Sequence, residues 1–143
     1  LFRAQYSSMM HLLVLYAATG VILGHNFPFY LNFRGGKGIA ATAGLVLSFH
    51  PVMAVLGIIT FFSIFFTTHY VSLGSLAVYA GLMIEMVVFG QMGWFDLSQN
   101  HLIELYVLMA FLTALAYWKH RGNIKRLLEG TERKTYLTKK SQQ

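Results

Sequence analysis

A short basic and glycine-rich stretch, Arg34 to Gly38, has the residue types needed to bind an anion. It reads Arg-Gly-Gly-Lys-Gly, and an apolar run follows it directly. Glycines at Gly35, Gly36 and Gly38 permit close backbone approach and positive φ angles, so successive N–H groups can converge on a phosphate. A helix that starts here would add free amides and the positive end of its dipole. Lys37 would supply a mobile charge and Arg34 a fork of donors.

Two other interpretations of this stretch bear on the ligand. The spacing before Lys37 and the absence of Ser or Thr directly after it differ from the nucleoside-triphosphate P-loop, which excludes that site. A flexible basic loop that touches anionic lipid headgroups would also have this composition. The residues themselves therefore leave a phosphate pocket and a lipid-contacting loop as alternatives.

A second polar cluster lies near the other end of the chain, in WKHRGNIKRLLEGTERK (118–134). Ile124, Leu127 and Leu128 follow i, i+3, i+4 spacing beside basic residues, which predicts a short amphipathic helix at the membrane interface. Gly122 and Gly130 would bound this helix. A basic tail that only holds the chain to anionic lipid is the simpler alternative.

Three polar side chains in this second cluster are not explained by lipid contact. They are His120, Asn123 and Glu132. If both clusters lie on one face of the membrane, these side chains can point toward the glycine stretch. An Asn there can fix a hydroxyl or carbonyl group, because its amide both donates and accepts hydrogen bonds.

The elements that must position these clusters are apolar helices. Of the 143 residues, 56% are hydrophobic and 11% are charged, and the mean hydropathy is +0.55. This composition predicts an all-α, polytopic transmembrane bundle in a single domain, residues 1–143. About five membrane segments are expected, at 9–24, 38–49, 52–68, 71–90 and 101–118. The second is too short to span about 30 Å, since His50 and Pro51 interrupt it.

The basic residues orient this bundle. Every Lys and Arg except Arg3 lies either at 34–37 or at 119–140, so the positive-inside rule places both clusters on the cytoplasmic face. No signal peptide is recognisable, and the start at Leu1 predicts a missing amino-terminal piece. Metal-ligand spacing is absent among the scattered histidines, so no metal site is expected at His11, His50, His69 or His101. Glu85 is a functional candidate as an ionisable group at membrane depth, although a partner or an interfacial position is the preferred explanation.

The two clusters together resemble a known family. The stretch GHNFPFYLNFRGGKGIAATAG (24–44), followed about 75 residues later by HRGNIKRLLEGTERK (120–134), is similar to the bacterial acyl-phosphate glycerol-3-phosphate acyltransferases, the PlsY family. The resemblance implies acyl transfer from acyl phosphate to the 1-position hydroxyl of glycerol 3-phosphate. The products would be lysophosphatidate and phosphate, in the first acylation of bacterial phospholipid synthesis. It further implies a multi-pass protein of the bacterial inner membrane with its active site on the cytoplasmic face.

The resemblance also assigns residues and partners. It makes Gly35, Gly36, Lys37 and Gly38 the glycerol 3-phosphate loop, with His25 in the same motif. It makes His120 and Asn123 necessary for activity and Glu132 structural, while Arg34 or Arg126 could neutralise the leaving phosphate. The expected partners are acyl phosphate, glycerol 3-phosphate and membrane lipid, with an enzyme that supplies acyl phosphate as a further candidate. No cofactor, metal or nucleic acid is expected. The acyl chain is predicted to run between helices walled by FFSIFF (61–66) and the fourth helix.

The chain departs from the family pattern in two ways. Ala41 stands where many members have Thr, and Thr42 is a candidate to compensate. An earlier family motif, Gly-Ser-Gly-Asn-x-Gly-Ala-Thr-Asn, has no match, so about two helices are expected to be missing from the front. Two alternatives to an active enzyme therefore stay open, a membrane carrier for a phosphorylated solute and an inactive, truncated scaffold.

Overall fold

The computed structural model describes residues 9–136, and within that range the chain is helical with no strand. Seven elements follow one another: α2 (Met10–Asn26), the 3-10 helix η2 (Phe29–Leu31), α3 (Ile39–Phe49), α4 (Pro51–Thr68), α5 (Val71–Gln91), α6 (Gln99–Lys119) and α7 (Arg121–Leu128). The prediction of an all-α membrane bundle is confirmed. Four of the described spans are long and apolar enough to cross a membrane, and α3 is the shorter fifth apolar helix.

The shortness of α3 has the cause expected from the sequence. The helix ends at Phe49, and His50 adopts an extended conformation as the N-cap of α4. The Nδ1 atom of His50 accepts a hydrogen bond from the backbone N–H of Val52 at 3.3 Å. Pro51 occupies the first turn of α4, where its missing N–H costs nothing. One helix therefore stops and the next begins within two residues.

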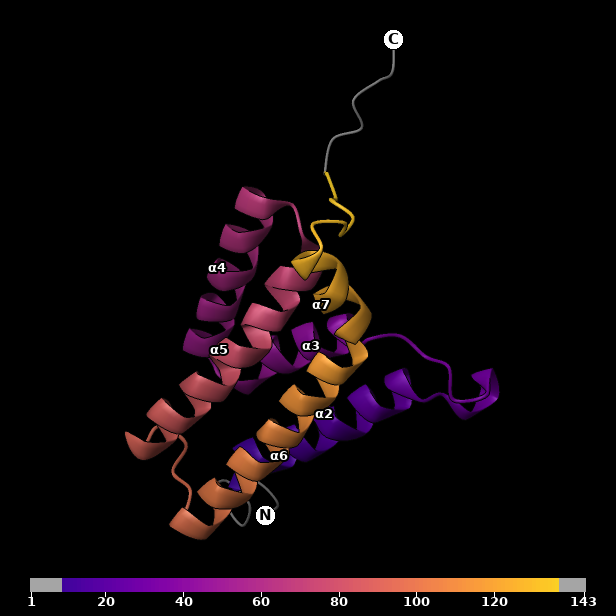
Figure 1. Cartoon of the computed structure of the whole chain (residues 1–143). Coiled ribbons are helices and arrows are strands. Elements are labelled where there is room, and N and C mark those ends of the chain that lie inside the picture. Colours follow the sequence, from indigo (N-terminus) through magenta and orange to yellow (C-terminus); the bar gives the residue numbers. More distant parts are fainter. Residues whose placement is uncertain (1–8, 137–143) are drawn as a thin grey trace.

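The five apolar helices form a closed ring (Figure 1). Each helix from α2 to α6 packs on its neighbour in sequence, and α2 also packs on α6. Inside the ring lies an apolar core to which all five helices contribute, including Leu15, Met53, Tyr79, Met86 and Met109. Helix α4 packs on both α3 and α5, and it lies between them on one side of the bundle.

Two histidines meet at the end of the ring opposite the glycine stretch. The ring centroids of His11 and His50 are 6.4 Å apart, and both side chains pack on the aromatic ring of Phe95. The sequence separates these two histidines by almost forty positions, so this aromatic cluster was not predictable from spacing. Among residues 9–136, no three His, Asp or Glu side chains gather closely enough to hold a metal ion.

The connections that carry the polar clusters meet at one end of the bundle. There α7 lies over the end of α6, and the segment after it returns to the turn between α4 and α5 (Figure 1). The backbone N–H of Thr135 donates to the carbonyl of His69 at 2.8 Å, and the ring of Tyr136 packs at a tilt against His69. This tail segment therefore fastens α7 to the α4–α5 turn.

The amphipathic helix predicted near the end of the chain is present as α7, with a different boundary. It begins at Arg121 rather than at Gly122. Ile124 and Leu127 are half-buried, whereas Leu128 is exposed, and the fully buried residue of the helix is Asn123. The most buried side chain on the face of α7 that packs on the bundle is therefore the amide of Asn123.

Candidate active site

The glycine stretch is folded back onto the end of α2. A Cβ atom added at Gly35 would lie 2.1 Å from the carbonyl oxygen of His25 and 2.4 Å from Cδ of Pro28. A Cβ at Gly36 would lie 2.4 Å from Nε2 of His25. These two glycines are therefore required by the close approach of His25 and its neighbours, and neither has a positive φ angle. The predicted supporting residue His25 does lie against the loop.

Gly38 serves a different purpose, because it is the N-cap of α3. Its φ angle is +77°, in the left-handed region that favours glycine, and it is buried. No side chain caps the start of α3, so the first amides of that helix are free to bind an anion. The predicted helix start directly after the glycines is thus confirmed.

The two polar clusters meet through Lys37 and Asn123, which are 86 positions apart in the sequence. Lys37 Nζ donates to Asn123 Oδ1 at 2.6 Å. The other end of the same amide, Nδ2, donates to Glu132 Oε1 at 2.6 Å. A cation on one side and a carboxylate on the other fix the orientation of the amide. Lys37 keeps two further N–H donors for a ligand.

Glu132 is the centre of this network. Its side chain is 7% exposed, and besides Asn123 it accepts from Ser72 Oγ at 2.7 Å and from Arg126 Nε at 2.7 Å. Burial alone would raise the pKa of this carboxyl, but the three hydrogen bonds and the Arg126 charge outweigh burial and hold the pKa below its usual value. The carboxylate therefore stays ionised and joins α5, α7 and the tail.

His120 lies at the junction of α6 and α7 and is fully buried. Its Nδ1 lies 2.8 Å from the carbonyl of Ala116, and because a carbonyl can only accept, Nδ1 carries the proton. Nε2 is then a free acceptor, buried without a hydrogen-bond partner in the described part of the chain. Burial and the charge of Lys37 lower the pKa of His120, while the Ala116 bond and Glu132 act in the opposite direction without reversing the shift. The imidazole is therefore neutral near pH 7.

One predicted phosphate-binding residue stands apart from this network. Arg34 is exposed, and its side chain makes no ion pair or hydrogen bond within residues 9–136. It follows η2, and we call the segment from η2 to Arg34 the arm. Arg126, the other candidate for neutralising a leaving phosphate, is paired with Glu132. The structure thus brings together Lys37, Asn123, Glu132 and Arg126 and leaves Arg34 on the arm.

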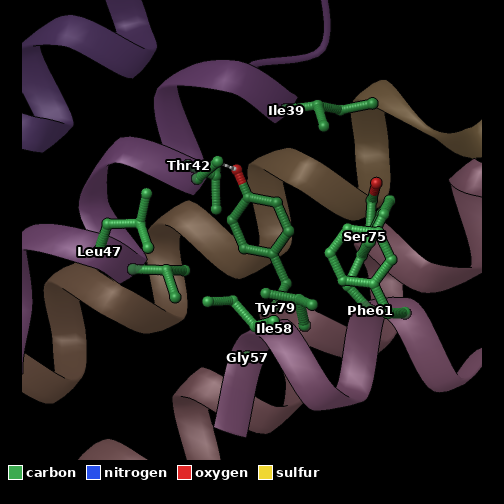
Figure 2. Close-up of a pocket in the computed structure, with 12 residues that line it drawn as sticks. Ile39, Thr42, Leu47, Gly57, Ile58, Phe61, Ser75 and Tyr79 are labelled. Atoms are coloured by element: carbon green, nitrogen blue, oxygen red, sulfur yellow. Dashed lines mark hydrogen bonds between the residues drawn. The ribbon is translucent and has the colours of Figure 1, made fainter. Parts of the chain in front are cut away.

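An apolar pocket of about 260 Å³ lies between α3 and α5, with α4 as its third wall (Figure 2). Ile39, at one end of the pocket, directly follows the glycine stretch. From there the pocket follows one face of α3, past Thr42 and Ala43, to Leu47. Helices α4 and α5 also line the pocket, with residues that include Gly57, Phe61, Phe62 and Tyr79. An apolar space therefore begins beside the candidate phosphate loop and leads away from it.

The structure also adds polar residues that the sequence did not single out. Ser72, in the first turn of α5, holds Glu132, and a polar residue in the first turn of a membrane helix at the basic face is a usable signal. Lys119 Nζ donates to the backbone carbonyl of Asn26 at 2.7 Å and lies 4.1 Å from the ring centroid of Phe27. This contact ties the end of α6 to the end of α2. No sequence pattern indicated it.

For Glu85, where the sequence predicts a partner or an interfacial position, the described residues provide no hydrogen-bond partner to Oε2. The side chain is half-buried on α5. Glu104 on α6 does have such a partner, since it accepts from the hydroxyl of Tyr16 on α2.

A family model, curated proteins and solved structures that are similar to this chain are all described as glycerol-3-phosphate acyltransferases. The family model described as glycerol-3-phosphate acyltransferase matches residues 1–130. A curated glycerol-3-phosphate acyltransferase of Halalkalibacterium halodurans is 46% identical over 121 residues, covering 82% of this chain and 55% of the relative. A second one, from Bacillus cereus, is 34% identical over 127 residues, covering 88% of this chain and 58% of the relative. The chain thus spans little more than half the length of these relatives.

Solved structures are similar as well. The crystal structure of PlsY (YgiH), an integral membrane glycerol 3-phosphate acyltransferase, in its glycerol 3-phosphate form, superposes with a TM-score of 0.69 at 30% identity, covering 80% of this chain and 52% of that one. The lysophosphatidic acid form gives a TM-score of 0.68 at the same identity, covering 80% and 54%. Because the family model matches residues 1–130 and both relatives and solved structures of the same kind are similar to this chain, the chain belongs to the glycerol-3-phosphate acyltransferase family.

Proposed function

We propose that this chain, as a single domain, transfers an acyl group from acyl phosphate to the 1-position hydroxyl of glycerol 3-phosphate. The products are lysophosphatidate and inorganic phosphate. The observation that carries the proposal is the Lys37–Asn123 hydrogen bond, which joins the two polar clusters into one site. The glycerol 3-phosphate and lysophosphatidic acid bound to the similar PlsY structures support this choice of acceptor and product.

The acceptor's phosphate binds at the start of α3. The remaining N–H donors of the Lys37 ammonium group and the first amides of the helix bind it, while Gly35 and Gly36 let the loop pack closely on His25. Asn123 keeps the ammonium group of Lys37 in place. Arg34 on its arm, or Arg126, neutralises the phosphate that leaves the donor.

The chemical step needs a positioned hydroxyl, because acyl phosphate is already an activated anhydride. The hydroxyl oxygen attacks the acyl carbon and forms the ester bond, while the bond from that carbon to the phosphate oxygen breaks and phosphate leaves with the electron pair. The free Nε2 of neutral His120 accepts the hydrogen bond of the attacking hydroxyl and orients it. The proton leaves to Nε2 or to the departing phosphate. No cofactor is needed for this step.

The acyl chain of the donor lies in the apolar pocket between α3, α4 and α5. The pocket starts at Ile39, next to the phosphate loop, and its wall contains Phe61 and Phe62 of the FFSIFF segment. Leu47 and Ile58 at the far end are 62% and 45% exposed, so a longer chain can continue into the bilayer.

The chain lies in the inner membrane of a bacterial cell, and its site faces the cytoplasm. The basic residues at the polar end of the bundle, from Arg34 and Lys37 to the segment beginning at Lys119, support this orientation. Acyl phosphate and glycerol 3-phosphate then reach the site from the cytoplasm, where an enzyme that supplies acyl phosphate would also work.

A transfer assay tests the function. Vesicles containing the chain are incubated with acyl phosphate and labelled glycerol 3-phosphate, and labelled lysophosphatidate is measured in the organic phase. We expect labelled lysophosphatidate with the parent chain and none with Asn123→Ala. Label that accumulates inside sealed vesicles without product would instead identify a carrier. Neither product nor uptake, beside an active full-length relative in the same vesicles, would identify an inactive scaffold.

A further inference from the structure

A buried tyrosine hydroxyl connects the apolar pocket to the phosphate loop. Tyr79 of α5 is 1% exposed and lies across the pocket, with its hydroxyl at the side chain of Thr42 on α3 (Figure 2). The two hydroxyl groups form a hydrogen bond. A hydroxyl buried in an apolar interior is costly unless it is bonded, so this pairing holds α3 and α5 together at this point.

The direction of this hydrogen-bond chain follows from counting protons. Thr42 Oγ1 also lies 2.9 Å from the carbonyl oxygen of Gly38. A carbonyl only accepts, so the single hydroxyl proton of Thr42 goes to Gly38. Tyr79 must then donate to Thr42. The chain therefore runs from Tyr79 to Thr42 to Gly38, from the middle of the bundle to the last glycine of the loop.

Gly38 is the residue whose placement matters most for binding an anion. It has a φ angle of +77°, directly follows Lys37, and is the N-cap of α3. Its carbonyl accepts both from Thr42 Oγ1 and from the backbone N–H of Thr42 at 2.8 Å. Any shift of this peptide would turn the free amides of α3 and the backbone of Lys37 away from a common ligand.

A threonine bonded to the carbonyl four positions earlier is, by itself, ordinary in this chain. Thr19 bonds to Leu15 and Ser75 to Val71 in the same way. What sets Thr42 apart is the second hydroxyl, which arrives from another helix and polarises the bond to Gly38. A purely local role for Thr42 would need no such partner.

We propose that Tyr79 and Thr42 are positioning residues that hold the Gly38 peptide, and with it the phosphate loop, in the geometry that binds glycerol 3-phosphate. The choice of ligand rests on the function proposed above.

The chain provides a matched pair of variants. Tyr79→Phe removes one hydroxyl and keeps the pocket wall. Tyr117→Phe removes a hydroxyl that donates from α6 to the carbonyl of Leu76 on α5 at 3.2 Å, with no connection to the loop. The loss of one buried hydrogen bond corresponds to about a five- to tenfold rise in the KM for glycerol 3-phosphate in Tyr79→Phe. The KM for acyl phosphate should be unchanged, and Tyr117→Phe should change neither KM.

Thr42 gives a second measurement in the same assay. Thr42→Val is expected to raise the KM for glycerol 3-phosphate as Tyr79→Phe does, and Thr42→Ser, which restores the hydroxyl, to return it toward the parent value. Equal KM values in Tyr79→Phe and the parent chain, or equal rises in Tyr79→Phe and Tyr117→Phe, would overturn the positioning role.

Thermal unfolding separates this inference from the proposed function. The melting temperature of the full chain in detergent is measured against increasing glycerol 3-phosphate, without donor. A parent chain that the ligand does not stabilise contradicts the proposed function, and the inference falls with it. If the same concentration of glycerol 3-phosphate stabilises the parent chain and Tyr79→Phe, the positioning role of Tyr79 is contradicted and the proposed function is not. Stabilisation of Tyr79→Phe only at five- to tenfold higher concentration supports it.

Discussion

Asn123 has one amide group and two charged neighbours, and this alone fixes its orientation. Its oxygen faces the Lys37 ammonium group and its nitrogen faces the Glu132 carboxylate. An amide turned by 180° would place a donor against a cation and an acceptor against an anion. Because Glu132 is held in turn by Ser72 and Arg126, the position of the Lys37 side chain depends on contacts two residues away from it in the network.

At the scale of single residues, Lys37→Ala should weaken glycerol 3-phosphate binding without unfolding the protein. A hydrogen bond to a charged group contributes about 1.5–3 kcal/mol, so the KM should rise by about tenfold to a hundredfold. The control is Lys125→Ala, because the Lys125–Glu129 pair is exposed and 3.9 Å long. Steady-state kinetics in vesicles give the answer, and an unchanged KM in Lys37→Ala would rule out the assigned contact.

His120 should make the stability of the fold depend on pH. Burial lowers its pKa below the ordinary value of about 6.5, so the unfolded chain binds a proton there before the folded chain does. Stability is therefore full above about pH 6.5 and falls as the pH drops toward the depressed folded value. In His120→Asn, whose amide can still donate to Ala116, melting temperatures between pH 8 and pH 5.5 should vary less than in the parent. Parallel curves for the two proteins would contradict the buried neutral imidazole.

At the scale of elements, the polar face depends on several short segments held together by one carboxylate. α7 has eight residues and α3 has eleven, and neither is long enough to be stable as an isolated helix in water. Glu132 connects the start of α5 to α7, and Lys119 connects the end of α6 to the end of α2. These contacts turn separate helix ends into one surface.

Glu132→Gln should therefore destabilise the chain more than the same change at Glu129. The substitution at Glu132 removes the ion pair with Arg126 and puts an amide nitrogen among donors, in a side chain that is only 7% exposed. A cost of about 1–3 kcal/mol is expected, against less than about 0.5 kcal/mol for Glu129→Gln on the exposed face. Reversible unfolding in mixed micelles measures both. Equal losses would show that Glu132 is not the centre of the network.

At the scale of the whole molecule, the ring of helices separates two chemically different ends. One end gathers the basic residues and the candidate active site, and the other gathers His11, His50 and Phe95. The chain has no cysteine, so a single introduced thiol reports its own side of the membrane.

Thr131→Cys and Met92→Cys place such thiols at opposite ends, and both native residues are exposed. In intact bacterial cells, a membrane-impermeant maleimide should label Met92→Cys and should label Thr131→Cys only after the inner membrane is permeabilised. The reverse pattern would place the site outside and contradict the positive-inside assignment.

Much of this arrangement could be predicted from the sequence. Long apolar runs require helices in hydrocarbon, His50 and Pro51 stop α3, and the distribution of Lys and Arg puts both polar clusters at one end. The spacing of glycines around Lys37 predicted a helix start beside an anion site, and α3 does begin there.

Which side chains meet was decided only by the tertiary structure. The helices of this bundle are apolar around their whole circumference, so no amphipathic stripe in the sequence says which face turns inward, and lipid is as apolar as the core. Rotation and lateral packing of the helices therefore bring Tyr79 to Thr42, Ser72 to Glu132 and the backbone of His25 to Gly35. The sequence by itself determined the helices and the end at which the site lies, whereas the contacts that shape the site depend on packing between segments that are distant in the chain.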